Sequence, residues 1–213
     1  YTIMLTANAH VINPNLLLNL PYDPIKDFAP VATVYSTEYV LALHPSVPAN
    51  NMQQFIALAR SRPGQLNYAS TGNGSPNQLA AELFNMMVGV KTQHIPYKGG
   101  GPAMIDLIGG QVQLSFQTPI SIIAQIKSGK VKAMAITGKT RSSLLPQVPT
   151  FTEAGLSGFE VLGGWFGILA PAATPRRIID RLSTEIAKIL ALPETKETYD
   201  SQGMVPFIST PEQ

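Results

Sequence analysis

The chain alternates short apolar runs with longer segments in which apolar residues recur every three or four positions. Short runs are typical of buried strands, and the longer periodic segments are typical of amphipathic helices. The alternation is regular in the middle of the chain, where strands are predicted at residues 66–69, 92–97, 112–116 and 131–137 and helices at 76–88, 102–108 and 120–127. This order predicts an α/β protein in which helices cover both faces of a parallel sheet.

The flanking parts of the chain predict further elements. Near the start, the pattern predicts a buried strand at residues 2–5, a polar loop at 6–10, a short helix at 16–20 and strands at 28–34 and 39–43. A helix at 52–61 follows, and Asn50 and Gln53 are its expected cap. Beyond a Pro- and Gly-rich connection at 141–158, the pattern predicts an extended segment at 161–170, helices at 174–190 and 193–202, and a strand at 205–208. The helix at 174–190 is expected to bury Ile178, Leu182, Ile186 and Ile189.

A loop of small residues, Ser70-Thr71-Gly72-Asn73-Gly74, follows the predicted strand at 66–69. Ser75 is the expected N-cap of the next helix, Pro76 its first residue, and Gln78 the partner of Ser75 in a capping box. A Gly-rich turn that leads into a helix presents N–H groups and the positive end of the helix dipole, which suits an anion. Gly, Ser and Asn also serve simply to make such turns, so both interpretations stay open. The loop lacks the Lys-Ser/Thr of a Walker A motif.

A second loop of the same kind follows the predicted strand at 92–97. It consists of Lys98 and three glycines, Gly99 to Gly101, and Pro102 opens the next helix. In doubly wound sheets, such turns gather at the carboxyl ends of the strands. Two Gly-rich turns at successive helix starts, one of them with a Lys, are what a small carboxylate ligand needs.

Composition narrows the functional classes. The sequence has 213 residues, of which 45% are hydrophobic and 13% charged, enough for one large or two small domains. A net charge of +2 without a Lys/Arg cluster argues against nucleic-acid binding. The absence of Cys excludes disulfides and thiol chemistry. No run approaches the ~18 apolar residues of a membrane helix. Because the chain opens at Tyr1 rather than Met, we expect a leading segment to be missing.

Few side chains suggest catalysis or metal binding. His10, His44 and His94 are far apart and lack metal-ligand spacing, and His94 is expected to be a structural histidine. Ser70, Thr71 and Ser75 could be nucleophiles, but no G-x-S-x-G elbow surrounds them. Lys98 is expected to be an ordinary charged residue at the rim or in contact with the ligand. We therefore predict no catalytic residue, no metal and no cofactor.

Six segments together resemble the periplasmic solute-binding receptors of tripartite tricarboxylate transporters, the TctC or Bug family. They are YTIMLTANAHVINPNLLLNLPYDPIKDFAPV, NYASTGNGSPNQLAAELF, HIPYKGGGPAMIDLIGGQVQ, SGKVKAMAITGKTRSSLLPQVPTFTEAGLSGFEV, WFGILAPAATPRRIIDRL and GMVPFISTPEQ. The resemblance covers essentially the whole chain in the order of the family. No single segment is decisive, but the set is specific.

The resemblance implies a two-lobed, type II periplasmic-binding fold that closes on a ligand. Lobe one would consist of residues 1–40 and 161–213, without the family's opening segment, and lobe two of residues 41–160, with crossings near 39–45 and 161–171. The implied function is capture of a small carboxylate, such as a di- or tricarboxylate, an acidic amino acid or an aromatic acid, in the cleft between the lobes. The receptor would be periplasmic, directed by a signal peptide, and would hand its ligand to the membrane subunits of the transporter.

The resemblance also implies ligand-facing positions: Thr6, Ala7, Asn8, Ser70, Thr71, Gly74, Ser75, Asn77, Lys98, Gly99 and Gln117. Two of them depart from the family. Asn77 stands where a His is frequent, and Gln117 stands where an acidic residue is common. The loss of the acid at Gln117 favours a ligand without a cationic group. The alternatives are a sensor receptor that reports to a signalling partner, or an enzyme on a doubly wound α/β fold.

Overall fold

The computed structural model describes residues 2–16, 19–159 and 163–212. The chain forms two compact units. Unit 1 combines residues 1–37 with residues 164–213, and unit 2 comprises residues 38–163. The predicted extended segment at 161–170 begins outside the described residues and continues as the strand β8 of unit 1, Trp165–Pro171.

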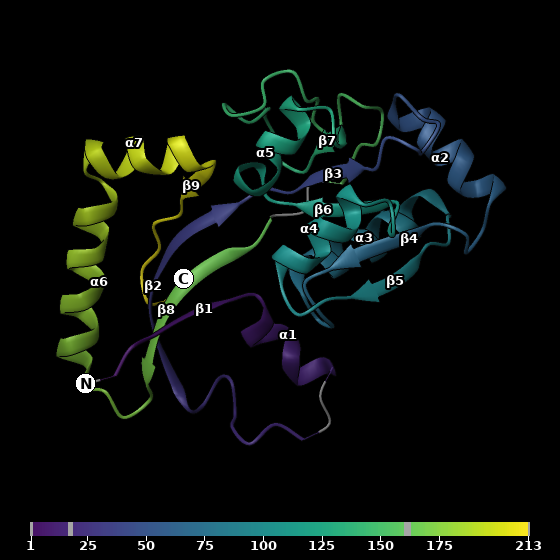
Figure 1. The fold of residues 1–213 in the computed structure, drawn as a ribbon. Helices are drawn as coiled ribbons and strands as arrows, with labels where there is room; N and C mark the ends of the chain where they lie inside the picture. Colours follow the sequence, from purple (N-terminus) through teal and green to yellow (C-terminus); the bar gives the residue numbers. More distant parts are fainter. Residues whose placement is uncertain (1, 17–18, 160–162, 213) are drawn as a thin grey trace. The chain divides into compact units, whose positions relative to one another are not determined.

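The described part of unit 2 contains a five-stranded sheet with the strand order β5-β4-β6-β3-β7 (Figure 1). The strands are β3 Val40–Leu43, β4 Asn67–Ser70, β5 Gln93–Pro96, β6 Leu114–Gln117 and β7 Lys132–Ile136. β4 runs parallel to β5 and β6. β3 runs antiparallel to both β6 and β7, so the expectation of a wholly parallel sheet is wrong for this strand. The strand–helix alternation fixes the direction of strands that follow a crossover helix, and β3 enters unit 2 without one.

Helices cover both faces of this sheet, as predicted. They are α2 Met52–Ser61, α3 Pro76–Val88, α4 Gly100–Ile108 and α5 Pro119–Lys127. Phe55 of α2 and Phe84 of α3 pack in one apolar cluster with Tyr68 of β4. Leu107 of α4 and Ile122 of α5 belong to a second cluster that contains the next strand residue, Ala69. Successive residues of a strand point to opposite faces, so Tyr68 and Ala69 of β4 belong to different clusters.

Phe84 is the centre of the aromatic packing in unit 2. Its side chain is fully buried. Its ring centroid lies 5.8 Å from that of Phe55 and 6.4 Å from that of Phe116. Phe151 and Phe159, from the end of the long connection, lie 6.3 and 6.1 Å from it. The connection is therefore irregular in its backbone, as predicted, but packs on α3 as part of the core.

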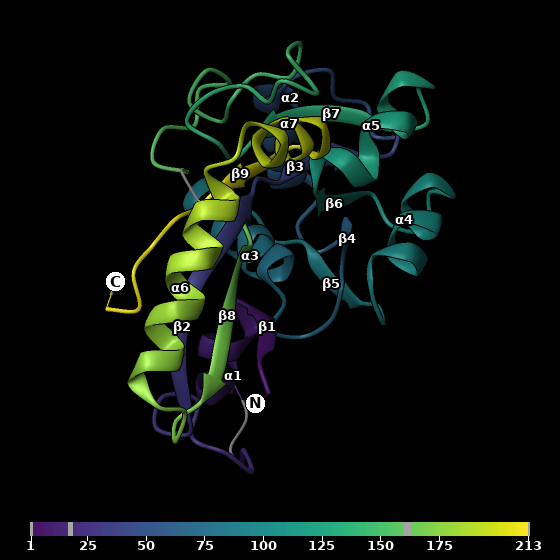
Figure 2. The same ribbon diagram turned by 90° about the vertical axis from the view of Figure 1, so that its left-hand side faces the viewer.

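The described part of unit 1 contains an antiparallel four-stranded sheet with the order β1-β8-β2-β9. The strands other than β8 are β1 Met4–Ala7, β2 Phe28–Thr37 and β9 Met204–Pro206, and the helices are α1 Ala9–Leu16, α6 Arg176–Leu190 and α7 Pro193–Gln202. α6 lies alongside β2 (Figure 2). Ile179 of α6 is buried against Val31 of β2 and Ala170 of β8.

The predicted core face of α6 is shifted by one residue at both ends. Ile179 and Leu190 are buried, with Leu182 and Ile186 partly buried between them. Ile189, predicted to be in the core, is 54% exposed. Apolar residues occupy both 178 and 179, and both 189 and 190, so the sequence alone does not fix the rotational phase of the helix.

The first residues of the chain differ from the prediction. β1 starts at Met4 and includes Thr6 and Ala7, which were expected in a loop. It is not a buried strand, since Leu5 is 62% exposed. The helix forms at α1 rather than at 16–20, of which residues 17 and 18 lie outside the description and 19 and 20 are not helical. Asn8 starts α1 by accepting the N–H groups of residues 11 and 12, and Pro14 removes only one bond inside it.

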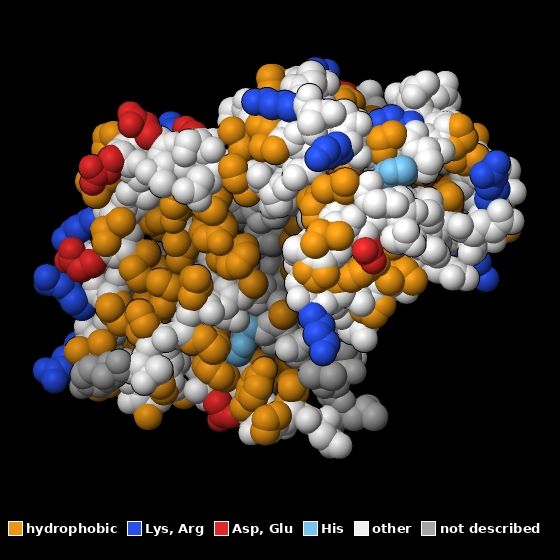
Figure 3. All heavy atoms as spheres, in the orientation of Figure 1, with side chains coloured by type: hydrophobic (Ala, Val, Ile, Leu, Met, Phe, Trp, Pro, Cys, Tyr) orange, Lys and Arg blue, Asp and Glu red, His pale blue; other side chains and the backbone are white. Residues whose placement is uncertain are grey.

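Unit 1 leaves much of its apolar surface uncovered. Hydrophobic side chains gather on its surface over α6 and the neighbouring strands (Figure 3). Val205, Phe207 and Ile208 are 49%, 42% and 51% exposed. The extensive hydrophobic core of the described residues therefore lies in unit 2, around the sheet that carries the two Gly-rich loops.

We predict that Phe84→Ala lowers the free energy of unfolding of unit 2 by about 3–5 kcal/mol, because the surrounding rings leave a cavity that they cannot close. Urea denaturation followed by far-UV circular dichroism measures this loss. The control is Met86→Ala on the same helix, where the side chain is 74% exposed. Equal midpoints for the two variants would contradict the assignment of Phe84 to the core.

Candidate functional site

The N-termini of α3, α4 and α5 lie at one edge of the unit 2 sheet. Each helix begins directly after β4, β5 or β6, and these strands run parallel, so their carboxyl ends share that edge. The N-cap residues are Ser75, Gly99 and Thr118, and none of them caps its helix with a side-chain hydrogen bond. The positive ends of these helix dipoles are therefore left to be satisfied by solvent or by a ligand.

The two Gly-rich loops lie next to each other, as predicted. The N–H of Tyr97, before the second loop, donates to the carbonyl of Ser70, before the first, at 3.0 Å. A Cβ on Gly100 would lie 4.0 Å from the methyl of Thr71. Thr71 of one loop is thus a neighbour of the first residue of α4.

Ser75 and Gln78 do not form the predicted capping box. The hydroxyl of Ser75 turns back and donates to the carbonyl of Gly72 at 2.6 Å. The Oε1 of Gln78 reaches past Ser75 and accepts the N–H of Gly74 at 2.6 Å. Within the described residues, no acceptor therefore bonds the N–H groups of Asn77 and Gln78 at the start of α3.

The start of α4 is open in the same way. Gly99 is its N-cap, with a φ of 111° that favours glycine. No described residue accepts a hydrogen bond from the N–H groups of Gly100 and Gly101. Lys98, immediately before Gly99, is exposed. Four N–H groups at two adjacent helix starts therefore have no hydrogen-bond acceptor among the described residues.

A chain of hydrogen bonds holds the first loop. The amide of Gln78 is oriented by Gly74, whose N–H can only donate, so its Nε2 donates to Nδ1 of His94 at 3.2 Å. Nδ1 then carries no proton, and Nε2 of His94 donates to the Oγ of Ser70 at 2.6 Å. The hydroxyl of Ser70 donates in turn to the carbonyl of Gly72 at 3.0 Å. We call this chain, from Gly74 through Gln78, His94 and Ser70 to Gly72, the loop relay.

The surroundings of His94 favour its neutral form. Its ring stacks on Tyr68, the residue beside it in the sheet register, with centroids 4.8 Å apart. The hydroxyl of Tyr68 donates to Glu82. Burial lowers the pKa of His94, and the charge of Glu82 opposes that shift only in part. His94 is the hydrogen-bonded structural histidine that the sequence led us to expect.

Ser70 and His94 do not form a nucleophile–base pair, although only 2.6 Å separates the Ser70 hydroxyl oxygen from His94 Nε2. The relay places the proton on that nitrogen, so it cannot accept the proton of Ser70. Nδ1 faces the amide of Gln78 instead of a carboxylate, which an activating triad would need. Ser70 is also fully buried. In addition, the described residues contain no His/Cys/Asp/Glu group that could hold a metal ion.

Asn77 connects the first loop to β6. Its Oδ1 accepts the hydroxyl of Thr71 at 3.1 Å, and its Nδ2 lies 3.5 Å from the carbonyl of Phe116. The residue is buried, with 4% of its surface exposed. Both ends of the Asn77 side chain are therefore bonded within the protein, and the bond from Thr71 orients the Thr71 hydroxyl.

Unit 2 contains eight of the predicted ligand-facing residues, and unit 1 contains Thr6, Ala7 and Asn8. Thr6 and Ala7 pair with Gly167 and Phe166 in the sheet. The Oδ1 of Asn8 accepts the N–H of Trp165 at 2.7 Å. Neither Gln78 nor His94 is among the ligand-facing positions predicted from the sequence. Their partnership depends on the pairing of β4 with β5, for which a single sequence carries no signal.

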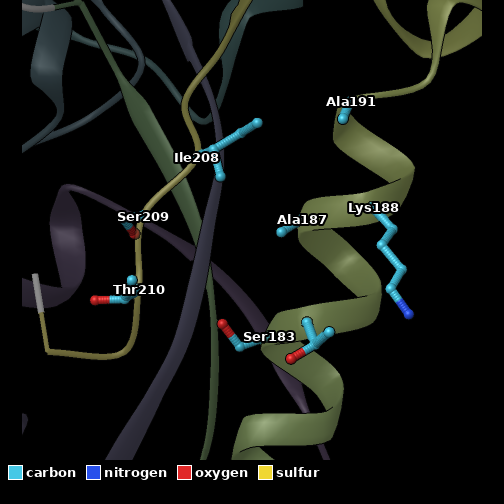
Figure 4. A pocket seen from close by; sticks show the side chains of 8 residues that line it. Ser183, Ala187, Lys188, Ala191, Ile208, Ser209 and Thr210 are labelled. Atoms are coloured by element: carbon cyan, nitrogen blue, oxygen red, sulfur yellow. The ribbon is translucent and has the colours of Figure 1, made fainter.

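Unit 1 has a groove of about 560 Å³ between α6 and residues 208–210 (Figure 4). Its lining consists of Ser, Thr, Ala and Ile side chains, with Lys188 at the rim. Figure 4 shows the Lys188 side chain pointing away from residues 208–210, and its Nζ lies 3.1 Å from the carboxylate of Glu185. The groove thus presents no charged group to an anion.

Over the described residues, none of the helices is long and apolar enough to span a membrane.

The whole chain, residues 1–213, matches the family model described as tripartite tricarboxylate transporter family receptor. Among curated proteins, Protein BugT of Bordetella pertussis is 34% identical over 100% of this chain and 66% of its own length. A Pseudomonas protein named for the tcbD-tcbE intergenic region is also 34% identical, over 100% of this chain and 63% of its own length. The chain thus spans less than two thirds of the length of these relatives.

Solved structures of similar proteins also match this chain. A structure titled as a periplasmic transporter is 37% identical, with a TM-score of 0.89 over 100% of this chain and 71% of its own. The Rhodopseudomonas palustris protein MatC with bound malate is 31% identical, with a TM-score of 0.83 over 96% of this chain and 69% of its own. The R. palustris protein Rpa4515 with adipate is 31% identical, with a TM-score of 0.91 over 100% and 71%.

The loop relay predicts that His94 is neutral at neutral pH, with its proton on Nε2. Two-bond ¹H–¹⁵N correlation spectra of the histidine rings measure this directly, and the His94→Asn variant identifies the signal. A proton on Nδ1 would contradict the relay, because Nδ1 would then face the amide nitrogen of Gln78.

The same arrangement predicts a loss of stability in acid. The pKa of His94 is lower in the folded state than its ordinary value of 6.5, so the unfolded chain binds the proton more readily. The contribution of neutral His94 to the stability of the fold is present above pH 6.5. It is lost as the pH falls from 6.5 through the folded-state pKa of His94. Urea denaturation across this range should show a loss in the wild type that is smaller in His94→Asn. If the free energy of unfolding depends on pH in the same way in both proteins, this role of His94 is contradicted.

Proposed function

The chain belongs to the tripartite tricarboxylate transporter receptor family, and we propose that it is a periplasmic solute-binding receptor for a small dicarboxylate. The observation that carries this proposal is the pair of uncapped, adjacent helix starts at α3 and α4. The similar proteins solved with malate and with adipate support a dicarboxylate among the acids that the resemblance implies. The proposed partner is the membrane part of a tripartite tricarboxylate transporter.

The proposed contacts are made mainly by the backbone. One carboxylate of the ligand accepts the N–H groups of Asn77 and Gln78 on α3 and of Gly100 and Gly101 on α4. A charge-assisted bond of this kind contributes roughly 1.5–3 kcal/mol net. The Thr71 hydroxyl lies beside these groups, and the exposed ammonium of Lys98 attracts the anion over a longer range. Thr6, Ala7 and Asn8 of unit 1 remain a prediction from the resemblance.

We propose that the protein binds its ligand without chemical conversion. The one serine–histidine contact at the site has its proton on the histidine nitrogen that a general base would need free. The side chains of the first loop form hydrogen bonds with one another. These bonds keep the binding surface in place, but the bonded groups supply no proton acceptor. A receptor of this kind returns its ligand unchanged after denaturation.

A thermal-shift panel tests the proposal. We predict that the melting temperature rises with increasing concentration of a dicarboxylate, because a ligand that binds only the folded state stabilises it by mass action. The panel contains succinate, malate, adipate, citrate, aspartate, benzoate and inorganic phosphate. A shift with phosphate and with none of the carboxylates would contradict the proposal and favour the enzyme alternative.

Gly74→Val is predicted to abolish ligand binding while the protein stays folded. Gly74 has a φ of 75°, where a β-branched residue is strained, so its N–H and the loop must move. Gly129 is the matched control, since its φ is 71°, a Cβ there meets nothing within 4 Å, and it lies at the far end of α5. Gly129→Val should therefore introduce a similar backbone strain and keep full affinity by isothermal titration calorimetry. Normal ligand affinity in Gly74→Val would rule out this loop as the binding site.

A further inference from the structure

Gln117 is the last residue of β6 and lies at the edge where α3, α4 and α5 begin. Its side chain is almost completely buried, with 5% of the residue exposed. The Nε2 of Gln117 donates to the Oγ of Ser115 at 2.8 Å. A primary amide has a donating end and an accepting end, so the orientation of this amide decides which of them a ligand would meet.

Ser115 fixes that orientation. Its hydroxyl donates to the backbone carbonyl of Ala69 at 2.9 Å, and this carbonyl can only accept. The single hydroxyl proton is thus in use, and towards Gln117 the oxygen of Ser115 can only accept. The donating end of the amide therefore faces Ser115. A flipped amide would set two acceptors against each other and leave buried polar groups unpaired, which is unfavourable.

The accepting end, Oε1, is left for a ligand. Because Nε2 is bonded to Ser115, which lies back along β6, Oε1 is the end of the amide that is turned away from Ser115. Among the described residues no donor bonds it. Oε1 of Gln117 is not completely buried either. Among the described residues, the side-chain polar atom that is completely buried and has no hydrogen-bond partner is Oε1 of Gln125. The site therefore combines N–H donors for a carboxylate with one fixed carbonyl acceptor.

We propose that Gln117 makes the site selective for a hydroxylated dicarboxylate over the same acid without the hydroxyl. This inference rests on the proposed function and adds the chemistry of the ligand's carbon chain. A carboxylate oxygen cannot bond Oε1, because both are acceptors, whereas a hydroxyl beside the carboxylate donates to it. An ammonium group is less suited, because the positive ends of the three helices and the nearby Lys98 surround this edge.

Isothermal titration calorimetry with two matched pairs tests the inference: succinate against malate, and adipate against 2-hydroxyadipate. In the wild type, the hydroxylated member of the better-binding pair should bind about fivefold more tightly, the factor that one net neutral hydrogen bond gives. Gln117→Met keeps a chain of similar length without the acceptor. It should abolish the preference by weakening only the hydroxylated acid.

Ser115→Ala tests the orientation itself. Removing the acceptor of Nε2 lets the amide turn, so the preference should shrink although Gln117 is intact. Circular dichroism melting shows whether this variant and Gln117→Met remain folded. If Ser115→Ala does not fold, the titrations of wild type and Gln117→Met still show whether Gln117 causes the preference for the hydroxylated acid.

The outcomes separate this inference from the proposed function. Equal affinity for both members of each pair in the wild type, or an undiminished preference in Gln117→Met, would overturn the role of Gln117 and leave a dicarboxylate receptor. Binding of none of these acids would overturn both proposals. A preference that disappears with the amide supports both.

Discussion

The parallel pairing of β4 with β5 and β6 is the constraint on which the rest of the site depends. It brings the ends of these strands to one edge, and each strand leads directly into a helix there. The small residues between strand and helix are what allow two neighbouring loops to lie together. Without this register, Thr71 would not meet the start of α4, and His94 would not stand beside Tyr68.

Side chains and backbone have different roles at the candidate site. The polar side chains of the first loop bond one another through the loop relay and the Asn77 contacts. The N–H groups of Asn77, Gln78, Gly100 and Gly101 have no acceptor in the part of the chain that the structure describes. Backbone donors held in this way need little reorganisation when an anion arrives, which keeps the entropic cost of binding low. A site of this type fixes a carboxylate by direction rather than by an Arg clamp, and leaves specificity to single groups such as Gln117.

Sequence reasoning performed best where a local signal was complete. The bounds of α2, α3 and α7 were predicted as observed, since Pro76, Pro193 and Gly203 mark helix ends by their own geometry. The cap of α2 was misplaced by one residue: Asn51, not Asn50, accepts the N–H of Gln54. Both the direction of β3 and the rotational phase of α6 depend on tertiary neighbours, which the local pattern does not contain.

The candidate site shows the same division. The Gly-rich turns and the helix starts were visible in the sequence because their composition is unusual. The capping box was a reasonable prediction that failed, since the long side chain of Gln78 reaches Gly74 and His94 in place of Ser75. Gln78 and His94 are separated by sixteen residues, and only strand pairing makes them partners.

If the starts of α3 and α4 bind a carboxylate through their backbone, their amide signals must respond to the ligand. A ¹H–¹⁵N correlation spectrum of the protein during titration with malate or adipate measures this response. We predict that the largest amide shifts belong to Asn77, Gln78, Gly100 and Gly101. Saturable binding that leaves these four amides unchanged, with the shifts confined to the groove of α6 and residues 208–210, would contradict it.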